Sequence, residues 1–359
     1  MSKLQDKLRK ATNNKLSATL EKSKFFNEKD LIRTRVPILN LALSGKLDGG
    51  IVPGLTMLAG PSKHFKSNLG LVMVSAYMRE HKDAICLFFD NEFGSTPEYF
   101  GAMGVPTDRV EHIPFKNVEE LKFQMVNALE EIDRGEKVII MIDSIGNVAS
   151  KKEVEDAKAE KSVGDMTRAK QIKSLFRMVT PYLTMLDIPC IGINHTYETQ
   201  EMYSKTVMSG GTGPMYSADT VIIIGRQQEK DGKEIVGYNF ILNIEKSRYV
   251  KEKSKLPLNV MFEGGINTYS GLLDLAVELG YVHKPSNGWF QRAFLDTESG
   301  ELVVAEDEKK MRRAETDNVD FWKPLFAHEP FKQAATSRYK LGCIATTEET
   351  LEEVNELFS

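Results

Sequence analysis

The sequence has few cysteines, no long apolar run and no large excess of charge of one sign. Its three cysteines, Cys86, Cys190 and Cys343, lie far apart and lack the spacing of metal ligands. Two of them stand in the apolar runs AICLFF and IPCIGI, where cysteine is usually a small inert core residue. No apolar run approaches the ~20 residues that cross a bilayer, and the N-terminus lacks a secretory apolar stretch. We therefore expect a cytoplasmic, reduced protein without a membrane partner.

The bulk composition is that of an ordinary globular protein. Hydrophobic residues make up 41% of the 359 residues and charged residues 27%, with a formal net charge of -4. Mild acidity does not exclude a nucleic-acid binder, because basic residues can concentrate on one face. The sequence has no internal repeat and no low-complexity tract.

Strand-like apolar runs alternate with helical stretches between residues 36 and 265. Three later runs then follow one another without a helix between them. This order predicts an α/β fold with a mostly parallel central sheet, helices on both faces and antiparallel strands at one edge. The expected strands are 55–60, 85–90, 110–115, 137–144 and 188–194, then 219–227, 238–248 and 256–265.

Segments of different composition flank this predicted core, 36–268. Residues 1–35 are charged and helix-prone, which predicts a small helical arm that folds on its own domain or docks on a neighbouring subunit. Residues 269–359 are helical in composition and charged, which predicts a small C-terminal domain.

The segment GPSKHFKS, Gly60 to Ser67, resembles a phosphate-binding loop with one substitution. In the pattern G-x-x-x-x-G-K-[ST], backbone N–H groups wrap a phosphate, lysine reaches the outer phosphates and the hydroxyl binds Mg²⁺. Phe65 stands where the second glycine is expected, and a positive φ there would cost about 1–2 kcal/mol. The loop follows a strand and opens a helix, which suits an anion. By itself it is equally compatible with a nucleotide site and a false match.

Acidic residues at two other strand ends favour the nucleotide site. KVIIMIDS ends in Asp143, as a Walker B strand does, and FFDNEFGS places Asp90 and Glu92 at the end of another strand. Such carboxylates can hold Mg²⁺ through water or orient the water that attacks a γ-phosphate. Tyr99 can stack on adenine or pack locally.

Five segments in this order resemble the RecA family of recombinases, over roughly residues 20–340. Phenylalanine replaces the same glycine in a branch of that family from T-even-like bacteriophages. The resemblance implies a RecA-like P-loop ATPase core and a helical filament on DNA with ATP held between subunits. The segments are LSGKLDGGIVPGLTMLAGPSKHFKS, LFFDNEFGSTPEYFGAMGV, VIIMIDSIGNVASKKE, INHTYETQEMYSKTVMSGGTGPMYSADTV and EGGINTYSGLLDLAVELG.

The resemblance also implies residue roles. Glu92 is the catalytic base and Tyr99 the adenine-stacking ring, while Ser67 and Asp143 hold Mg²⁺. The ATP contacts it implies are Gly60, Pro61, Ser62, Lys63, His64, Phe65, Lys66, Ser67, Asn68, Tyr99 and Asp143.

Three further residues complete the implied catalytic set. Lys246 and Arg248 match the two bases that reach the neighbour's γ-phosphate, and two-residue spacing on a strand puts both on one face. His195 stands where bacterial members carry glutamine as the γ-phosphate sensor. Because imidazole titrates near neutrality, we hypothesise that the coupling between ATP and DNA is pH-sensitive.

Two long segments, 150–165 and 195–214, correspond to the DNA-binding loops of the family. Glycines allow close approach to phosphates, Tyr and Met can wedge between bases, and a basic helix face follows the first loop. A solvated helix face is the alternative for the basic residues. The candidate DNA contacts are Arg168, Lys173, Arg177, Tyr203, Lys205, Met208, Gly210 and Gly211.

These features predict a DNA-dependent ATPase that forms filaments on single-stranded DNA and catalyses homologous pairing and strand exchange. ATP and Mg²⁺ are the expected cofactors, and the expected partners are both forms of DNA, other copies of the chain, a single-strand-binding protein and a loader. Phe25 and Phe26 are expected to anchor the arm on the next protomer. Two alternatives are a hexameric helicase of the RecA-like class and a mediator that binds nucleotide without hydrolysis.

Overall fold

The structure is a computed structural model, and it describes residues 3–25, 31–159, 167–199, 206–296 and 298–341. Its centre is a sheet in which six strands run parallel and three more follow antiparallel at one edge. The parallel strands are β1 (Gly54–Ala59), β2 (Ile85–Asp90), β3 (Val110–Pro114), β4 (Val138–Asp143), β5 (Pro189–Asn194) and β8 (Thr220–Asp231), and the antiparallel ones are β9 (Glu234–Ser247), β10 (Lys255–Met261) and β11 (Gly265–Ile266).

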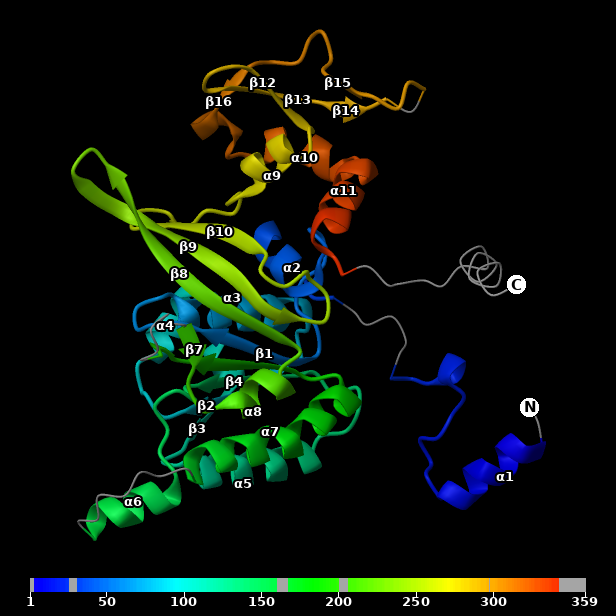
Figure 1. Cartoon of the computed structure of the whole chain (residues 1–359), viewed down its shortest axis with the longest axis vertical. Helices are drawn as coiled ribbons and strands as arrows, with labels where there is room; N and C mark the ends of the chain where they lie inside the picture. Colours follow the sequence, from blue (N-terminus) through cyan, green and yellow to red (C-terminus); the bar gives the residue numbers. More distant parts are fainter. Residues whose placement is uncertain (1–2, 26–30, 160–166, 200–205, 297, 342–359) are drawn as a thin grey trace, which may run out of the picture.

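The strand order across this sheet explains where a ligand can bind. Within the described residues it is a nine-stranded sheet in the order β11-β10-β9-β8-β1-β5-β4-β2-β3 (Figure 1). Every residue of β1, β4 and β5 is buried, as expected of central strands covered on both faces. The carboxyl ends of the parallel strands meet at one edge, and ligands of α/β sheets bind there. The predicted α/β architecture is confirmed.

Helices cover the two faces of the sheet and form two apolar clusters. On one face lie α2 (Pro37–Ser44) and α3 (Lys66–Glu80), with α4 (Pro97–Ala102) and η2 (Thr107–Arg109) near the β3 edge. On the other face lie α5 (Val118–Glu130) and α7 (Thr167–Leu186), which pack side by side (Figure 1).

The segments expected to be DNA-binding loops contain regular structure that the sequence analysis did not predict. The first begins with α6 (Lys151–Lys158), which the paired side chains of Ser150 and Glu153 cap at its N-terminus. The second forms a hairpin, β6 (Thr196–Glu198) and β7 (Thr206–Met208), followed by α8 (Thr212–Ser217). Residues 160–166 and 200–205, which include the predicted contacts Tyr203 and Lys205, lie outside the described residues.

The N-terminal arm is helical, as predicted. It contains α1 (Lys3–Thr12) and η1 (Leu20–Lys22), and α1 buries none of its residues. Figure 1 shows α1 apart from the sheet and its helices. The ring of Phe25 lies under the guanidinium of Arg134, 4.8 Å from its central carbon, whereas Phe26 lies outside the described residues.

The C-terminal region is the small domain that was predicted, and short strands stand among its helices. Strands of two to five residues carry too little periodicity to be recognised in a charged sequence. Residues 342–359, which include the glutamate-rich terminal stretch TTEETLEEVNELFS, lie outside the described residues. The elements are α9 (Leu272–Glu278), β12 (Val282–Ser286), β13 (Trp289–Arg292), β14 (Phe294–Leu295), β15 (Leu302–Val303), β16 (Met311–Arg312), η3 (Arg313–Thr316), α10 (Val319–Ala327) and α11 (Glu329–Tyr339).

Two expectations from composition can be compared with the structure. Cys86 and Cys190 are buried, and burial raises the pKa of the Cys86 thiol to about 12, so both are core residues as predicted. Among the described helices, none combines the length and the apolar character needed to span a membrane. The domain boundaries after residues 35 and 268 stay predictions.

Candidate functional site

The candidate phosphate-binding loop connects β1 to α3 at the carboxyl edge of the sheet. A side chain at Gly60 would come within 2.9 Å of the carbonyl oxygen of Ile224, so only glycine fits there. Phe65 has φ 61° and ψ 16°, the left-handed conformation considered from the sequence. Its ring stacks on Phe240 with centroids 5.1 Å apart. Such a pair contributes about 0.5–1.5 kcal/mol, which offsets much of the backbone strain.

Lys66 begins α3 with its ammonium group turned into the loop. Its Nζ donates a hydrogen bond to the carbonyl oxygen of Pro61 at 2.8 Å, and the residue is only 6% exposed. Burial lowers the pKa of Lys66, while the nearby charges of Glu92 and Asp143 oppose this shift. The structure thus brings the predicted lysine and both predicted carboxylates into one site.

Asp143 and Ser67 are suited to hold a magnesium ion. The carboxylate of Asp143 is buried at the end of β4 and hydrogen-bonds the hydroxyl of Ser67. Its Oδ1 has no hydrogen-bond partner among the described residues, and burial raises its pKa to about 6. A buried, unpartnered carboxylate oxygen beside a hydroxyl is what a hard cation such as Mg²⁺ requires.

Tyr99 reaches the same helix from α4. Its hydroxyl shares a hydrogen bond with the side chain of Asn68, and half-burial raises its pKa. The structure therefore places both predicted ATP contacts next to the loop.

Glu92 is held by three neighbouring side chains. The hydroxyl of Ser144 donates to its Oε1, His195 Nε2 lies 3.1 Å from that oxygen, and Asn147 Nδ2 lies 3.5 Å away. The hydrogen bond with His195, together with that from Ser144, holds the pKa of Glu92 below its usual value although burial opposes the shift. Glu92 is therefore an ionised carboxylate, as a general base must be.

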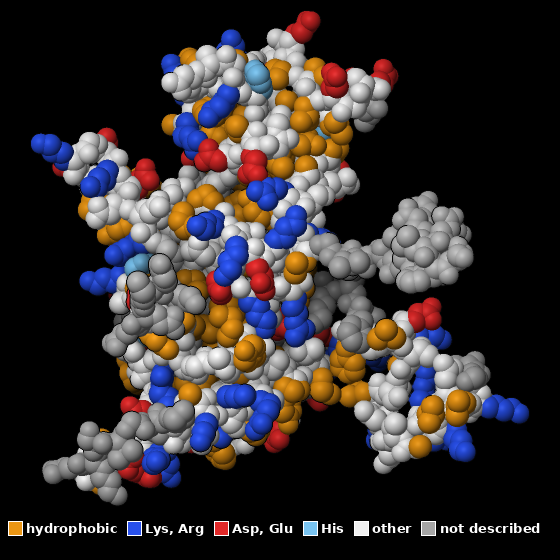
Figure 2. Space-filling model, in the orientation of Figure 1, with side chains coloured by type: hydrophobic (Ala, Val, Ile, Leu, Met, Phe, Trp, Pro, Cys, Tyr) orange, Lys and Arg blue, Asp and Glu red, His pale blue; other side chains and the backbone are white. Residues whose placement is uncertain are grey.

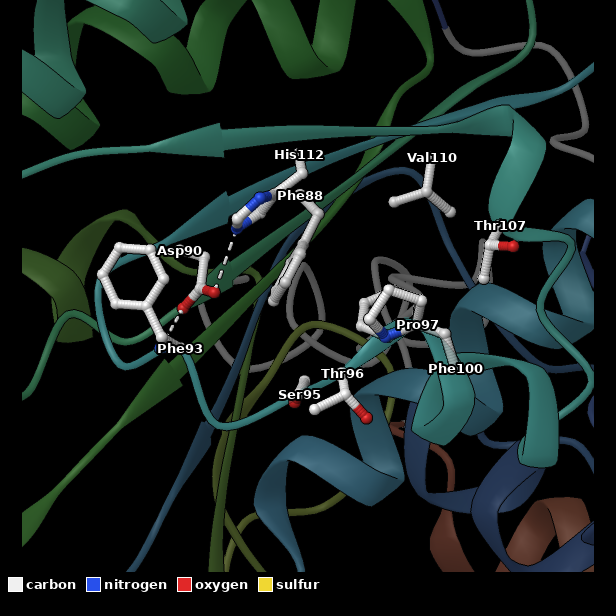
Figure 3. A pocket seen from close by; sticks show the side chains of 10 residues that line it. All are labelled: Phe88, Asp90, Phe93, Ser95, Thr96, Pro97, Phe100, Thr107, Val110 and His112. Carbon is white, nitrogen blue, oxygen red and sulfur yellow. Dashed lines mark hydrogen bonds and ion pairs between the residues drawn. The ribbon is translucent and has the colours of Figure 1, made fainter.

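A second carboxylate fixes the turn that carries Glu92. Asp90 Oδ1 accepts hydrogen bonds from the backbone N–H groups of Glu92 and Phe93, both at 2.9 Å. Its Oδ2 lies 3.1 Å from His112 Nε2. Figure 3 shows this cluster at one side of a pocket of about 290 Å³, whose opposite wall includes Phe100. From the sequence, Asp90 was expected only at a strand end, and His112 was not expected in the site.

Backbone contacts connect His195 to the hairpin of the second long segment. The N–H of Ser209 donates to the His195 carbonyl oxygen at 2.8 Å, and Asn194 Nδ2 donates to the Ser209 carbonyl oxygen at 3.0 Å. A side chain at Gly146 would come within 2.2 Å of the His195 ring. His195, the first residue of the predicted DNA-binding segment, therefore joins that segment to Glu92.

Arg168 connects the turn after β4 to the second long segment. Its guanidinium donates to the carbonyl oxygens of Val148 and Gly146, both at 2.6 Å, and to the hydroxyl of Ser209 at 3.2 Å. These bonds engage Nε and Nη2 within the chain, and a contact of Arg168 with DNA stays a prediction.

The remaining predicted DNA contacts divide into buried and exposed residues. Met208 is 5% exposed and packs in the core, which contradicts a role as an exposed wedge; its position at the end of β7 turns it inward. Gly210 and Gly211 have φ 89° and 74° and lead into α8. Lys173 and Arg177 are exposed on α7, over which Figure 2 shows a group of basic side chains.

Lys246 and Arg248 lie close to the segment that follows α8. Lys246 Nζ donates to three carbonyl oxygens at the end of α8, at 2.7–2.9 Å, where a positive charge complements the helix dipole. Arg248 Nε lies 2.8 Å from Asp219 Oδ1, and its side chain is 64% exposed. Their contact with a neighbouring subunit stays a prediction.

Comparisons with known proteins agree with this geometry. A family model described as RecA N-terminal domain matches residues 20–267, and one described as Bacteriophage T4, Recombination and repair protein, C-terminal domain matches residues 269–335.

The chain is also similar to individual proteins. The chain is 59% identical over 359 residues to the recombination and repair protein of Enterobacteria phage T4, covering 100% of this chain and 91% of that protein. It is 25% identical to Protein RecA of Bacteroides thetaiotaomicron, covering 74% and 79% of the two chains. A solved structure of the RadB recombinase has a TM-score of 0.46 and 18% identity, covering 63% of this chain and 95% of that one. The chain belongs to the RecA family.

Proposed function

We propose that this chain is a DNA-dependent ATPase recombinase. It forms a helical filament on single-stranded DNA and catalyses homologous pairing and strand exchange in recombination, recombination-dependent replication and repair. The observation that carries the proposal is the single network in which His195 contacts Glu92 on one side and Ser209 on the other. A change at the nucleotide site is thereby transmitted to the predicted DNA-binding segment.

The residues around the triphosphate have distinct tasks in this proposal. Lys66 and the N–H groups at the start of α3 bind the phosphates, and Tyr99 supports the base. Glu92 orients and deprotonates the attacking water. A magnesium ion held by Ser67 and Asp143 would neutralise phosphate charge.

DNA binding is proposed for the exposed parts of the two long segments and for the basic face of α7. Lys173 and Arg177 are exposed and four residues apart on that helix, so both project from one side. Contacts of this kind to phosphates carry little sequence information. Binding is therefore expected to be independent of sequence and strongly weakened by salt.

Filament formation is supported by two exposed apolar features. The arm keeps Leu4 63% exposed and Leu8 56% exposed. β3 is an edge strand of the described sheet, and Phe123 of α5, the next helix along the chain, is 67% exposed. Another chain can dock on an open sheet edge or on exposed apolar side chains. We propose that the arm, through Phe25 and Phe26, docks on the next protomer, and that Lys246 and Arg248 reach that protomer's ATP.

The partners and the place of action follow from the same proposal. A recombinase that loads on single strands competes with a single-strand-binding protein and needs a loader to displace it. We expect it to act in the cytoplasm of a phage-infected host.

Joint-molecule formation tests the proposal. The wild-type protein is mixed with ATP, Mg²⁺, a single strand and a homologous duplex, in parallel with Lys66→Ala and with a heterologous duplex. We expect joint molecules only with the wild-type protein and the homologous duplex. Equal joint-molecule yields with Lys66→Ala would refute the proposal, and so would ATP hydrolysis that single-stranded DNA leaves unchanged.

A further inference from the structure

Two non-glycine residues of the phosphate-binding loop have a left-handed backbone. Lys63 has φ 60° and Phe65 has φ 61°. Side chains other than glycine avoid this region because Cβ approaches the following carbonyl oxygen. Contacts from outside the loop must therefore hold it in this shape.

Both residues are held by one face of the β8–β9 hairpin. The ring of Phe65 stacks on Phe240 of β9 at 5.1 Å and 23°, and Phe240 is itself 3% exposed. The carbonyl oxygen of Lys63 accepts a hydrogen bond from Arg226 Nη1 of β8 at 3.1 Å. Arg226 and Phe240 are paired across the two strands, so their side chains leave the same face.

Tyr238 connects these two contacts. Its ring lies 5.9 Å from that of Phe240, and the guanidinium of Arg226 lies over it at 4.8 Å, within the range of a cation–π contact. We call Arg226, Tyr238 and Phe240 the hairpin brace. Because its members contact one another, a change in one shifts the others.

We propose that the hairpin brace positions the phosphate-binding loop for ATP. It keeps the loop in the conformation that binds ATP, and it takes no part in the hydrolysis step at Glu92. The inference rests on the proposed function, since it assigns a role at the same nucleotide site. The loop of this chain carries phenylalanine where glycine would need no support. The brace therefore supplies from the hairpin the conformational stability that a glycine would have by itself.

A glycine at position 65 should compensate for loss of the Phe240 ring. Phe240→Ala removes the ring under Phe65, and we expect the affinity for ATP to fall about tenfold as the loop leaves its left-handed shape. Phe65→Gly alone is measured as the reference for the double variant, because Phe65 is itself one of the implied ATP contacts. The double variant should recover most of the lost affinity, because glycine adopts the loop conformation without the ring.

The rescue separates positioning from a general loss of stability. Phe240→Ala leaves a cavity in the core, so its melting temperature falls and Phe65→Gly does not restore it. KM for ATP should follow the affinity, whereas kcat at saturation should stay within about twofold, because the groups around Glu92 are unchanged. Phe290→Ala is the matched control. The Phe290 ring is 2% exposed and has Lys284 over its face, but it belongs to β13 of the C-terminal region and not to the β8–β9 hairpin. It should lower the melting temperature and leave ATP affinity unchanged.

The experiment titrates full-length protein with Mg²⁺ and a fluorescent N-methylanthraniloyl ATP, alongside thermal denaturation. Phe240→Leu is a milder variant if Phe240→Ala does not fold, and its smaller loss should be rescued in the same way. The inference is overturned if Phe65→Gly fails to restore affinity in either background, or if Phe240→Ala and Phe240→Leu both bind as the wild type does. Absence of binding by the wild-type protein would instead overturn the proposed function, and the inference with it.

Discussion

The contact between His195 and Glu92 leads to a prediction about the pH dependence of hydrolysis. The imidazole lies 3.1 Å from the carboxylate, with side chains 23% and 34% exposed. A hydrogen bond to a charged group contributes about 1.5–3 kcal/mol, which partial exposure to solvent reduces to about 1 kcal/mol. That energy corresponds to roughly a fivefold change in an equilibrium.

The direction of the effect follows from the charge of imidazole. A positively charged imidazole holds the Glu92 carboxylate more strongly than a neutral ring does, and thereby weakens it as a base. DNA-stimulated ATP hydrolysis should therefore rise up to about fivefold from mildly acidic to mildly alkaline pH. In His195→Gln, a neutral amide replaces the ring, and the same interval should be nearly flat.

The assay is steady-state ATP hydrolysis at saturating ATP and single-stranded DNA across this pH range. His112→Gln is a matched control. His112 also lies 3.1 Å from a carboxylate oxygen, but that oxygen belongs to Asp90 and not to Glu92. Its profile should resemble that of the wild-type protein. Identical profiles for His195→Gln and the wild type would refute the reasoning.

Three further predictions concern the other predicted residues. Met208→Ala should lower the free energy of unfolding by about 2–5 kcal/mol in urea denaturation, because the side chain is buried; a weakened DNA affinity at unchanged stability would contradict its place in the core. Lys173→Gln with Arg177→Gln should reduce the salt slope of single-strand binding by about one to two, and an unchanged slope would exclude the α7 face. The double variant Phe25→Ala and Phe26→Ala should lose ATP-dependent filaments in electron micrographs while remaining folded by circular dichroism, whereas normal filaments would exclude the arm as the anchor.

Much of the fold and of the nucleotide site was predictable because both depend on local patterns. Buried parallel strands appear as continuous apolar runs, and the phosphate loop and Asp143 follow directly from such runs. Contacts between distant segments were not predictable in this way. Phe240 is 175 positions from Phe65, and nothing in its own strand indicates that its ring supports a loop.

Two residues of the predicted DNA-binding region show the same effect of long-range packing. Met208 sits in a polar, glycine-rich segment, so its sequence neighbours suggested exposure, yet β7 turns its side chain into the core. Arg168 belongs to a basic helix, but the carbonyl oxygens that it contacts come from another segment. Long-range packing decides the role of such residues.

Mixing two inactive variants tests most directly whether each ATP is hydrolysed between two copies of the chain. Glu92→Gln lacks the base, and Lys246→Gln with Arg248→Gln lacks the groups proposed to reach the neighbour's ATP. Each should be inactive alone. Mixed in equal amounts on single-stranded DNA, they should form complete sites at about a quarter of the contacts between subunits. ATP hydrolysis should then return to about a quarter of the wild-type rate. Activity no greater than the sum of the two separate variants would contradict a shared site.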